Sequence, residues 1–403
     1  MGLSMKYQEL ADKYGTPLYV YDFNHIQTQF AKLKEAFKAR KSIIFYAVKA
    51  NSNLSVLKQL KELGAGCDCV SIGEVKRALH VGVAKYKIIF SGVGKRDDEI
   101  REALEHDILM INLESEEEMG RVEVIAKELG LKARISIRVN PNIDAKTHPY
   151  ISTGLHDNKF GVDIDSAKRM YIKAKNSKDL VPVGIHFHIG SQITELEPFR
   201  EASKVVSDLL RSLKALKIDI KFFDIGGGVG IDYEGEETIN LYDYSQAIFE
   251  NLTGLDVTLT CEPGRFLVGN SGVFLTKVLY EKNNGKKRFV IVDGAMNDLG
   301  RPSLYGAYHE IEVLGRKDDM SKADVVGPVC ESTDFFAKDR VLPLTKHDDL
   351  VVIKSAGAYG FTMSSNYNTR ARVAEVALID GKDKLIRVRD NFEEMIKNEV
   401  ACI

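Results

Sequence analysis

The sequence has 403 residues, with 56 Lys or Arg and 58 Asp or Glu, so its formal net charge is −2. This balance excludes a general electrostatic attraction to nucleic acid or anionic lipid. No apolar run approaches the roughly 18 residues of a membrane span, and the first residues, MGLSMKYQEL, lack the apolar core of a signal peptide. We therefore expect a cytoplasmic protein with no nucleic-acid or membrane partner, whose five scattered cysteines are reduced.

Strand-length apolar runs alternate with amphipathic helical stretches in the first two thirds of the chain. The eight predicted strands cover residues 43–48, 66–71, 87–92, 108–115, 133–141, 182–191, 220–228 and 257–265. Helix signals lie between them, such as the leucines of LSVLKQLKELG and the capping box of Ser115 and Glu118. This α/β pattern predicts a (β/α)8 TIM-type barrel, which typically needs roughly 250 residues, with a doubly wound open sheet as the alternative.

The pattern changes after Arg265. Two period-two runs flank a turn signal at Asn283, Asn284 and Gly285, which predicts a hairpin, and further strand-like runs follow. We therefore expect a barrel domain over 23–265 and a mostly β C-terminal domain over 266–403. The strand-like TPLYVYD near the N-terminus, within 1–22, is expected to join the second domain.

Two candidate functional features follow predicted strands. In a barrel of this kind, the active face lies at the carboxyl ends of the strands. Lys49 ends the first strand; at such a rim, desolvation and nearby cations lower the pKa of an amine enough for Schiff-base chemistry, although a surface charge is the alternative. Glycines 226–228 of DIGGGVG follow the seventh strand and let backbone N–H groups approach a phosphate. A tight turn without a ligand is the other interpretation of these glycines.

An acid and two histidines complete the pattern. Glu262, in CEPGR, is placed to pair with a pyridine nitrogen and keep it protonated, or to cap a helix. His186 and His188 lie two residues apart and suit a metal site, core packing or stacking on a cofactor ring. No acidic set with recognisable spacing completes a metal shell, so no metal is predicted. Amine, glycine loop, flat ring and acid together predict a pyridoxal 5′-phosphate site.

The chain carries six motifs that, in this order, resemble those of the fold type III pyridoxal-phosphate decarboxylases, most closely the diaminopimelate decarboxylases. They are FYAVKAN, HFHIGSQ, DIGGGVG, CEPGR, GPVCESTD and AGAYGFTMSSNYN, and they span almost the entire chain. The resemblance implies an N-terminal barrel, a C-terminal β domain that includes the N-terminal strand, and a homodimer with shared active sites. One departure, NYNTRAR without a proline after the arginine, concerns a loop.

The same resemblance implies roles for individual residues. Lys49 forms the internal aldimine, His188 stacks on the pyridine ring and Glu262 pairs with its nitrogen. The further cofactor-binding residues are Asp68, Ser191, Gly226, Gly227, Gly228, Gly264 and Tyr359. The substrate-binding residues are Arg265, Arg301, Tyr305, Glu331 and Tyr359. Cys330, contributed across the dimer interface, is the implied proton donor, with Lys49 as the alternative.

The implied reaction is the decarboxylation of meso-2,6-diaminopimelate to L-lysine and CO2, the last step of lysine biosynthesis. Its substrate carries an ammonium and a carboxylate at the far end, so a selective site needs an acid and paired cations, as Glu331, Arg265 and Arg301 supply. A decarboxylase of carboxynorspermidine or of a basic amino acid, a racemase, and a non-enzymatic pyridoxal-phosphate carrier are the alternatives. A carrier is typically a barrel alone, so the C-terminal domain argues against one.

Overall fold

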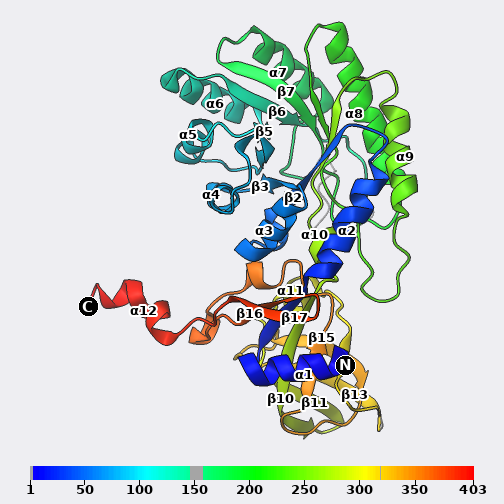
Figure 1. Ribbon diagram of the computed structural model, residues 1–403, viewed down its shortest axis with the longest axis vertical. Coiled ribbons are helices and arrows are strands. Elements are labelled where there is room, and N and C mark those ends of the chain that lie inside the picture. Colours follow the sequence, from blue (N-terminus) through cyan, green and yellow to red (C-terminus); the bar gives the residue numbers. More distant parts are fainter. Residues whose placement is uncertain (1–2, 146–157, 318) are drawn as a thin grey trace. The chain divides into compact units, whose positions relative to one another are not determined.

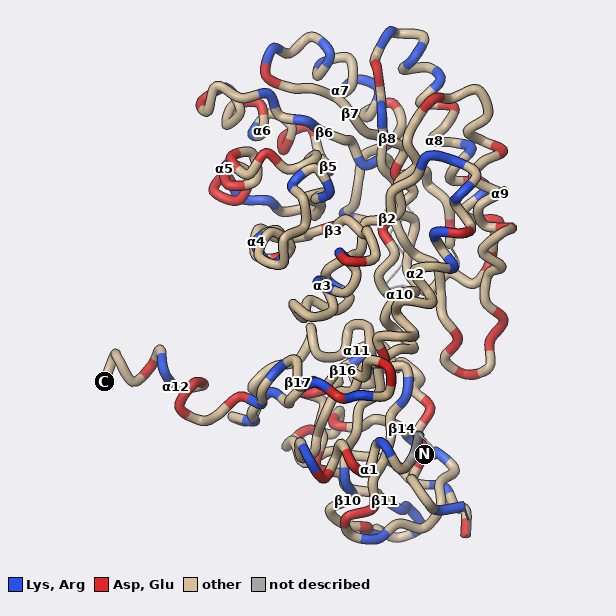
Figure 2. The backbone as a smooth tube through the Cα atoms, viewed as in Figure 1, with Lys and Arg blue, Asp and Glu red and all other residues tan. Residues whose placement is uncertain are grey.

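The computed structural model describes residues 3–145, 158–317 and 319–403. The chain divides into two compact units, each described by itself. One comprises Gln27–Ile231 and Glu237–Phe266, and the other comprises Met1–Ile26, Asp232–Glu236 and Leu267–Ile403. Basic and acidic residues are interspersed over both units rather than separated by sign (Figure 2). Among the described residues, no helix combines the length and the apolar character that a membrane crossing requires.

The first unit is a closed barrel of parallel strands, as predicted. Its strands, which pair in chain order, are β2 (Ser42–Ala47), β3 (Gly66–Cys69), β4 (Ile88–Phe90), β5 (Met110–Leu113), β6 (Ala133–Arg138), β7 (Leu180–His186), β8 (Phe222–Asp224) and β9 (Thr258–Cys261). Pairing of β2 with β9 closes the barrel. The helices that flank these strands on the outside (Figure 1) are α2 (Phe23–Ala36), α3 (Leu54–Glu62), α4 (Ile72–His80), α5 (Asp97–Glu105), α6 (Glu116–Leu129), α7 (Ile164–Asn176), α8 (Glu197–Ala215) and α9 (Leu241–Asn251).

Side chains fill the barrel, so it is a packed core and not a pore. Phe45, Ile89 and Met110, from β2, β4 and β5, form one buried interior cluster. Outside the barrel, α6 begins at its predicted cap. Ser115 caps α6 by accepting the Glu118 N–H at 3.1 Å, although the Glu118 carboxylate returns to the N–H of Glu114 and not to that of Ser115.

Several predicted strands extend too far at their carboxyl ends. We predicted strands over 182–191, 220–228 and 257–265. The observed strands end earlier, at His186, Asp224 and Cys261. His188, the triple glycine and Arg265 therefore lie beyond the strands, and the prediction of both histidines on one ideal strand is wrong. Backbone geometry is the cause after β8, because Gly226 and Gly228 have φ angles of 63° and 109°, which extended strands do not adopt.

The second unit is built on a mixed sheet, which within the described residues has nine strands in the order β14-β13-β11-β10-β1-β16-β17, with β15 pairing β10 and β12. Its elements are α1 (Leu3–Tyr14), β1 (Leu18–Asp22), β10 (Gly272–Asn284), β11 (Lys287–Val292), α11 (Arg301–Tyr305), β12 (Ile311–Val313), β13 (Ser321–Val326), β14 (Phe335–Leu342), β15 (Leu350–Ile353), β16 (Ala374–Ile379), β17 (Lys382–Arg387) and α12 (Phe392–Val400). A short helix α10 (Arg265–Val268) follows the barrel.

Strand β1 joins this sheet, as the sequence predicted for TPLYVYD. It pairs antiparallel with β10 and parallel with β16, with Leu18 opposite both Leu275 and Ala374. The predicted hairpin is present between β10 and β11, with Asn284 opposite Lys287 and Gly285 at a φ of 60°. Helix α1 and strands β13 and β14 were not predicted.

Arg288 on β11 forms hydrogen bonds to several segments of the second unit. Arg288 is 6% exposed, and its side chain donates to the carbonyls of Ser321, Leu342 and Pro343. It also pairs with the Glu281 carboxylate at 2.9 Å. Burial alone would raise the pKa of Glu281, but hydrogen bonds from Arg288 and Thr345 hold that pKa at about 2.

Substituting Arg288 should therefore destabilise the fold. Arg288→Leu removes the donor to three buried or partly buried carbonyls and the cationic partner of Glu281, and we expect a loss of about 3 kcal/mol in the free energy of unfolding. Arg101→Leu, which breaks an exposed pair with Glu128, is the matched control and should cost under about 1 kcal/mol. Denaturant unfolding measures both, and equal losses would contradict the assigned role of Arg288.

Candidate active site

Lys49 lies in a short 3-10 turn, Val48–Ala50, directly after β2. Its Nζ is 4.0 Å from Oδ2 of Asp68, and the Lys49 side chain is 41% exposed whereas that of Asp68 is 1% exposed. The two come together because Ala47 of β2 pairs with Asp68 of β3 across the parallel ladder. The result is an accessible amine that faces a buried carboxylate at the barrel rim.

A chain of buried polar side chains runs from Asp68 through the barrel to Glu262. Ser91 donates to Asp68 Oδ1 at 2.6 Å, and the Asn112 amide donates to Ser91 Oγ at 3.0 Å. The same Asn112 nitrogen lies 3.5 Å from Glu262 Oε1. The chain thus connects residues that follow or belong to β3, β4, β5 and β9.

Glu262 is buried directly after β9 in a group of ionisable residues. His186 Nε2 lies 3.2 Å from Glu262 Oε2, and one oxygen of Asp224 lies within 4.8 Å of atoms of both. Burial and the charge of Asp68 raise the pKa of Glu262 to about 8, against the opposing effects of Lys49 and Arg138. Burial also lowers the pKa of His186 to about 4, so its imidazole is neutral near pH 7.

The triple-glycine loop packs against His188 and the backbone of Glu262. The Gly227 N–H donates to His188 Nδ1 at 3.2 Å, which places the ring proton on Nε2. A side chain at Gly227 would put its Cβ 2.3 Å from the Glu262 carbonyl oxygen, so only glycine permits this approach. Burial, and then the charges of Arg138 and Lys49, hold the pKa of His188 well below its usual value.

Two further predicted residues meet at the same end of the barrel unit. Arg265, buried at the start of α10, donates from Nη2 to Ser191 Oγ at 3.1 Å. Gly264 is buried immediately before it. Arg138 at the end of β6, which pairs with His186 across the β6–β7 ladder, forms a buried 2.9 Å ion pair with Glu114, so its charge is compensated.

The remaining predicted residues belong to the second unit. Arg301 of α11 is buried, donates to His309 Nε2 at 3.0 Å and lies over the Tyr233 ring with 5.0 Å to the centroid. Tyr305 ends the same helix and is half-buried. Tyr359 is half-buried and has a φ of 56°, a left-handed conformation that is uncommon for tyrosine.

Cys330 and Glu331 are exposed in this unit. The Glu331 carboxylate accepts a hydrogen bond from the Tyr367 hydroxyl and another, at 3.0 Å, from the Thr333 hydroxyl. These two bonds lower the pKa of Glu331, with Tyr367 as the larger cause. The Cys330 N–H donates to the side chain of Asn368 at 3.3 Å.

The barrel residues fit pyridoxal 5′-phosphate. Among the described residues no lysine or arginine forms an ion pair with Glu262, so this buried acid is suited to a cationic ring nitrogen. Lys49 offers an accessible amine for an aldehyde. The glycine loop, with its positive φ angles, offers backbone that a phosphate can approach closely.

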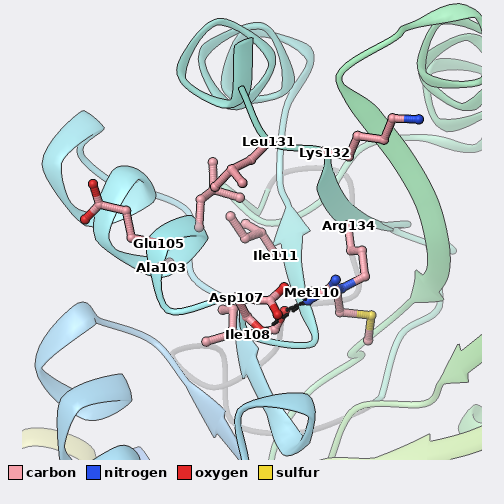
Figure 3. Close-up of a pocket in the computed structure, with 10 residues that line it drawn as sticks. Ala103, Glu105, Asp107, Ile108, Met110, Ile111, Leu131, Lys132 and Arg134 are labelled. Atoms are coloured by element: carbon pink, nitrogen blue, oxygen red, sulfur yellow. Dashed lines mark hydrogen bonds and ion pairs between the residues drawn. The ribbon is translucent and has the colours of Figure 1, made fainter. Parts of the chain in front are cut away.

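A cavity of about 340 Å³ lies at the other end of the barrel (Figure 3). Its lining comes from the end of α5 and from the amino-terminal ends of β5 and β6 with the residues just before them. The Arg134 guanidinium there is already bonded to the carbonyls of Leu109, Asp107 and Ile108. This cavity therefore does not belong to the candidate site.

Sequence reasoning missed Ser91, Asn112 and Asp224. Each is a buried polar residue inside or directly after an apolar run, in IIFS, MINL and FFD, and that exception to the pattern was the available signal. It also missed that His186 has acidic neighbours, because Asp224 and Glu262 are distant in sequence and meet only through barrel closure.

Comparison with known proteins identifies the family to which the chain belongs. The family model "Pyridoxal-dependent decarboxylase, pyridoxal binding domain" matches residues 23–269. Diaminopimelate decarboxylase of Campylobacter jejuni is 63% identical over 396 residues, which cover 98% of each chain. The crystal structure of diaminopimelate decarboxylase from Helicobacter pylori complexed with L-lysine is 55% identical, with a TM-score of 0.96 over 98% of this chain and 100% of that one.

A more distant structure supports the same assignment. Diaminopimelate decarboxylase from M. jannaschii, in co-complex with L-lysine, is 37% identical with a TM-score of 0.92 over 97% of this chain and 93% of that one. The fold and site thus define a pyridoxal-phosphate-dependent decarboxylase of fold type III. Within that class, the chain belongs to the diaminopimelate decarboxylase family.

The raised pKa of Glu262 predicts a pH-dependent stability of the cofactor-free protein. The folded-state pKa of about 8 lies above the ordinary 4.5, so the contribution of this residue to stability is complete below about pH 4.5 and is lost as the pH rises through 8. Glu262→Gln does not titrate, so the variant should gain several degrees in melting temperature over wild type at pH 8 but not at pH 5. A difference that stays constant across this range would show that the pKa of Glu262 is not raised.

Proposed function

We propose that this chain decarboxylates meso-2,6-diaminopimelate to L-lysine and CO2, the last step of lysine biosynthesis. The observation that carries the proposal is an accessible amine together with a buried acid that pairs with no lysine or arginine in the described ranges, in a chain 63% identical to a diaminopimelate decarboxylase. The crystal structures of related decarboxylases complexed with L-lysine support the identity of the product.

When bound, pyridoxal phosphate supplies an aldehyde that condenses with amines and a ring that accepts the electrons left by the departing carboxylate. In our proposal Lys49 holds the aldehyde carbon and Glu262 the ring nitrogen. His188 lies against the ring as a neutral imidazole, which its lowered pKa supports. The phosphate is held by Ser191, Gly226, Gly227, Gly228, Gly264 and Tyr359, and Asp68 completes the cofactor site.

Glu262 has the central electrostatic role in this proposal. An ionised carboxylate beside a ring nitrogen keeps that nitrogen protonated, and a protonated ring accepts electrons more readily. The surroundings of Glu262 are dry, which strengthens the interaction relative to water. Lys49 and Arg138 favour its ionised form, as their effects on its pKa indicate.

Recognition of the far end of the substrate is assigned to Arg265, Arg301, Tyr305 and Glu331. Two arginines suit a carboxylate, and Glu331 suits an ammonium. Glu331 is fixed by two hydroxyl donors and Arg301 by His309, so neither side chain has to be ordered on substrate binding. This arrangement favours a substrate whose far end carries both an ammonium and a carboxylate over a basic amino acid whose far end carries only an ammonium.

We also infer a cytoplasmic homodimer in which Cys330 and Glu331 of each subunit serve the site of the other, with the Cys330 thiol delivering the final proton. Exposure of both residues supports this. Large apolar side chains are also exposed near the C-terminus, among them Val388, Phe392 and Val400. In a dimer, these side chains are available for burial at the subunit interface.

The reaction is tested by measuring CO2 release and lysine formation from meso-diaminopimelate, with and without added pyridoxal phosphate. We expect turnover that depends on the cofactor, and at least about tenfold lower kcat/KM for L-lysine, L-ornithine and carboxynorspermidine, because these lack the paired far-end charges. Preferred turnover of any of the three, or racemisation without CO2 release, would refute the proposal.

Lys49 is tested separately by covalent trapping. Borohydride reduction of the holoenzyme should attach the cofactor to the peptide that contains Lys49, and Lys49→Ala should lose both this adduct and the absorbance at about 420 nm that lysine-bound cofactor gives. Lys58→Ala, on the exposed face of α3, is the control and should behave as wild type. An adduct that persists in Lys49→Ala would assign the amine to another lysine.

A further inference from the structure

Each oxygen of the Glu262 carboxylate has a neutral nitrogen beside it. His186 Nε2 lies 3.2 Å from Oε2 and the Asn112 amide nitrogen lies 3.5 Å from Oε1. His186 ends β7 and Asn112 lies within β5, so the two approach Glu262 from different parts of the barrel wall. Both are buried, with 2% and 0% exposure, so water does not compete for these contacts.

The surroundings fix the direction of both hydrogen bonds. The Asn112 amide has a carboxylate, Glu262, on one side and the Ser91 hydroxyl, which donates to Asp68, on the other. A flipped amide would point its carbonyl oxygen at the Glu262 carboxylate, which is repulsive. His186 Nδ1 has no hydrogen-bond partner in the described part of the chain, and a buried acceptor without a partner costs less than a buried N–H, so the ring proton belongs on Nε2.

We propose that His186 and Asn112 are positioning residues for Glu262, each donating a hydrogen bond to one carboxylate oxygen so that the acid is held ionised and oriented toward the cofactor nitrogen. The proposal rests on the proposed role of Glu262. It adds that neutral donors perform this task, which leaves the negative charge of Glu262 available to the cofactor. A lysine or arginine in their place would neutralise that charge.

Other charged groups also act on Glu262 and are common to all variants compared below. Asp68 from β3, Lys49 after β2 and Arg138 from β6 act through their charges, and Asp224 from β8 acts through a side-chain hydrogen bond that lowers the pKa of Glu262. Removing a donor from the charged form of an acid raises its pKa. Loss of the His186 donor should therefore move the acidic limb of kcat to higher pH by about one unit.

Two substitutions at His186 separate hydrogen bonding from packing. His186→Phe keeps a flat ring of similar size without a donor, whereas His186→Gln loses the ring but extends an N–H to about the position of Nε2. We expect His186→Phe to bind pyridoxal phosphate about fivefold more weakly and to show the shifted pH limb, and His186→Gln to stay within about twofold of wild type. Titration of the cofactor-free protein, followed by cofactor absorbance, measures the affinity.

Asn112 supplies the second test, should the Phe variant fail to fold. Asn112→Leu removes the weaker, longer contact, so we expect about threefold weaker cofactor binding. Ser136→Ala is its control, because Ser136 is another buried polar residue of the barrel whose hydroxyl has no hydrogen-bond partner in the described part of the chain. Cofactor binding by Ser136→Ala should equal that of wild type.

A double-mutant cycle with Glu262→Gln decides whether these residues act through Glu262. Glu262→Gln alone should bind the cofactor about tenfold more weakly, and adding His186→Phe to it should cause no further loss. The proposal is overturned if His186→Phe weakens binding equally in both backgrounds, or if His186→Gln is as impaired as His186→Phe. Wild-type cofactor affinity and activity in Glu262→Gln would instead refute the proposed role of Glu262 itself.

Discussion

Burial of the Glu262 carboxylate at the end of β9 is the constraint on which the barrel site depends. Water solvates an exposed acid, but a buried one must find donors or give up its charge. The barrel surrounds Glu262 with residues from several strands, and two of them, His186 and Asn112, place a neutral nitrogen beside a carboxylate oxygen. The described part of the site thus supplies hydrogen-bond donors to this acid but no lysine or arginine paired with it, and because the pKa of Glu262 is raised to about 8, a cationic ligand would favour the ionised form of this acid.

The cationic groups near Glu262 have other acidic partners and do not form a direct ion pair with it in the described structure. Arg138 is bonded to Glu114, which also accepts the Gly161 N–H, and Lys49 faces Asp68. A direct Arg138–Glu262 bridge would satisfy both charges more simply but would remove the anion from the site. The extra acid Glu114 thus explains how a buried arginine can influence Glu262 from nearby without binding it.

The sequence predicted the barrel because its signal is local: each buried parallel strand is an apolar run, and eight such runs alternate with helical stretches. It could not predict where the strands end, since that depends on backbone angles such as the positive φ of Gly226. Lys49, Glu262 and the glycine loop were recognisable because each stands at the end of a run. Asn112 was not, because a single polar residue inside MINL acquires meaning only when closure of the barrel brings β5 opposite the end of β9.

In both units, a charged side chain is oriented by hydrogen bonds from uncharged groups. In the barrel, Glu262 is oriented by groups that carry no net charge; in the second unit, Glu331 is oriented by the hydroxyls of Tyr367 and Thr333. Arg301 is likewise fixed by a neutral partner, because His309 donates from Nδ1 to the Lys354 carbonyl and so accepts from Arg301 at Nε2. Neutral partners leave the charge of each ionic group uncompensated. They also restrict its side-chain conformations before a ligand binds. Under the proposed function, the binding free energy of a doubly charged substrate end is then available for discrimination and is not consumed in ordering side chains.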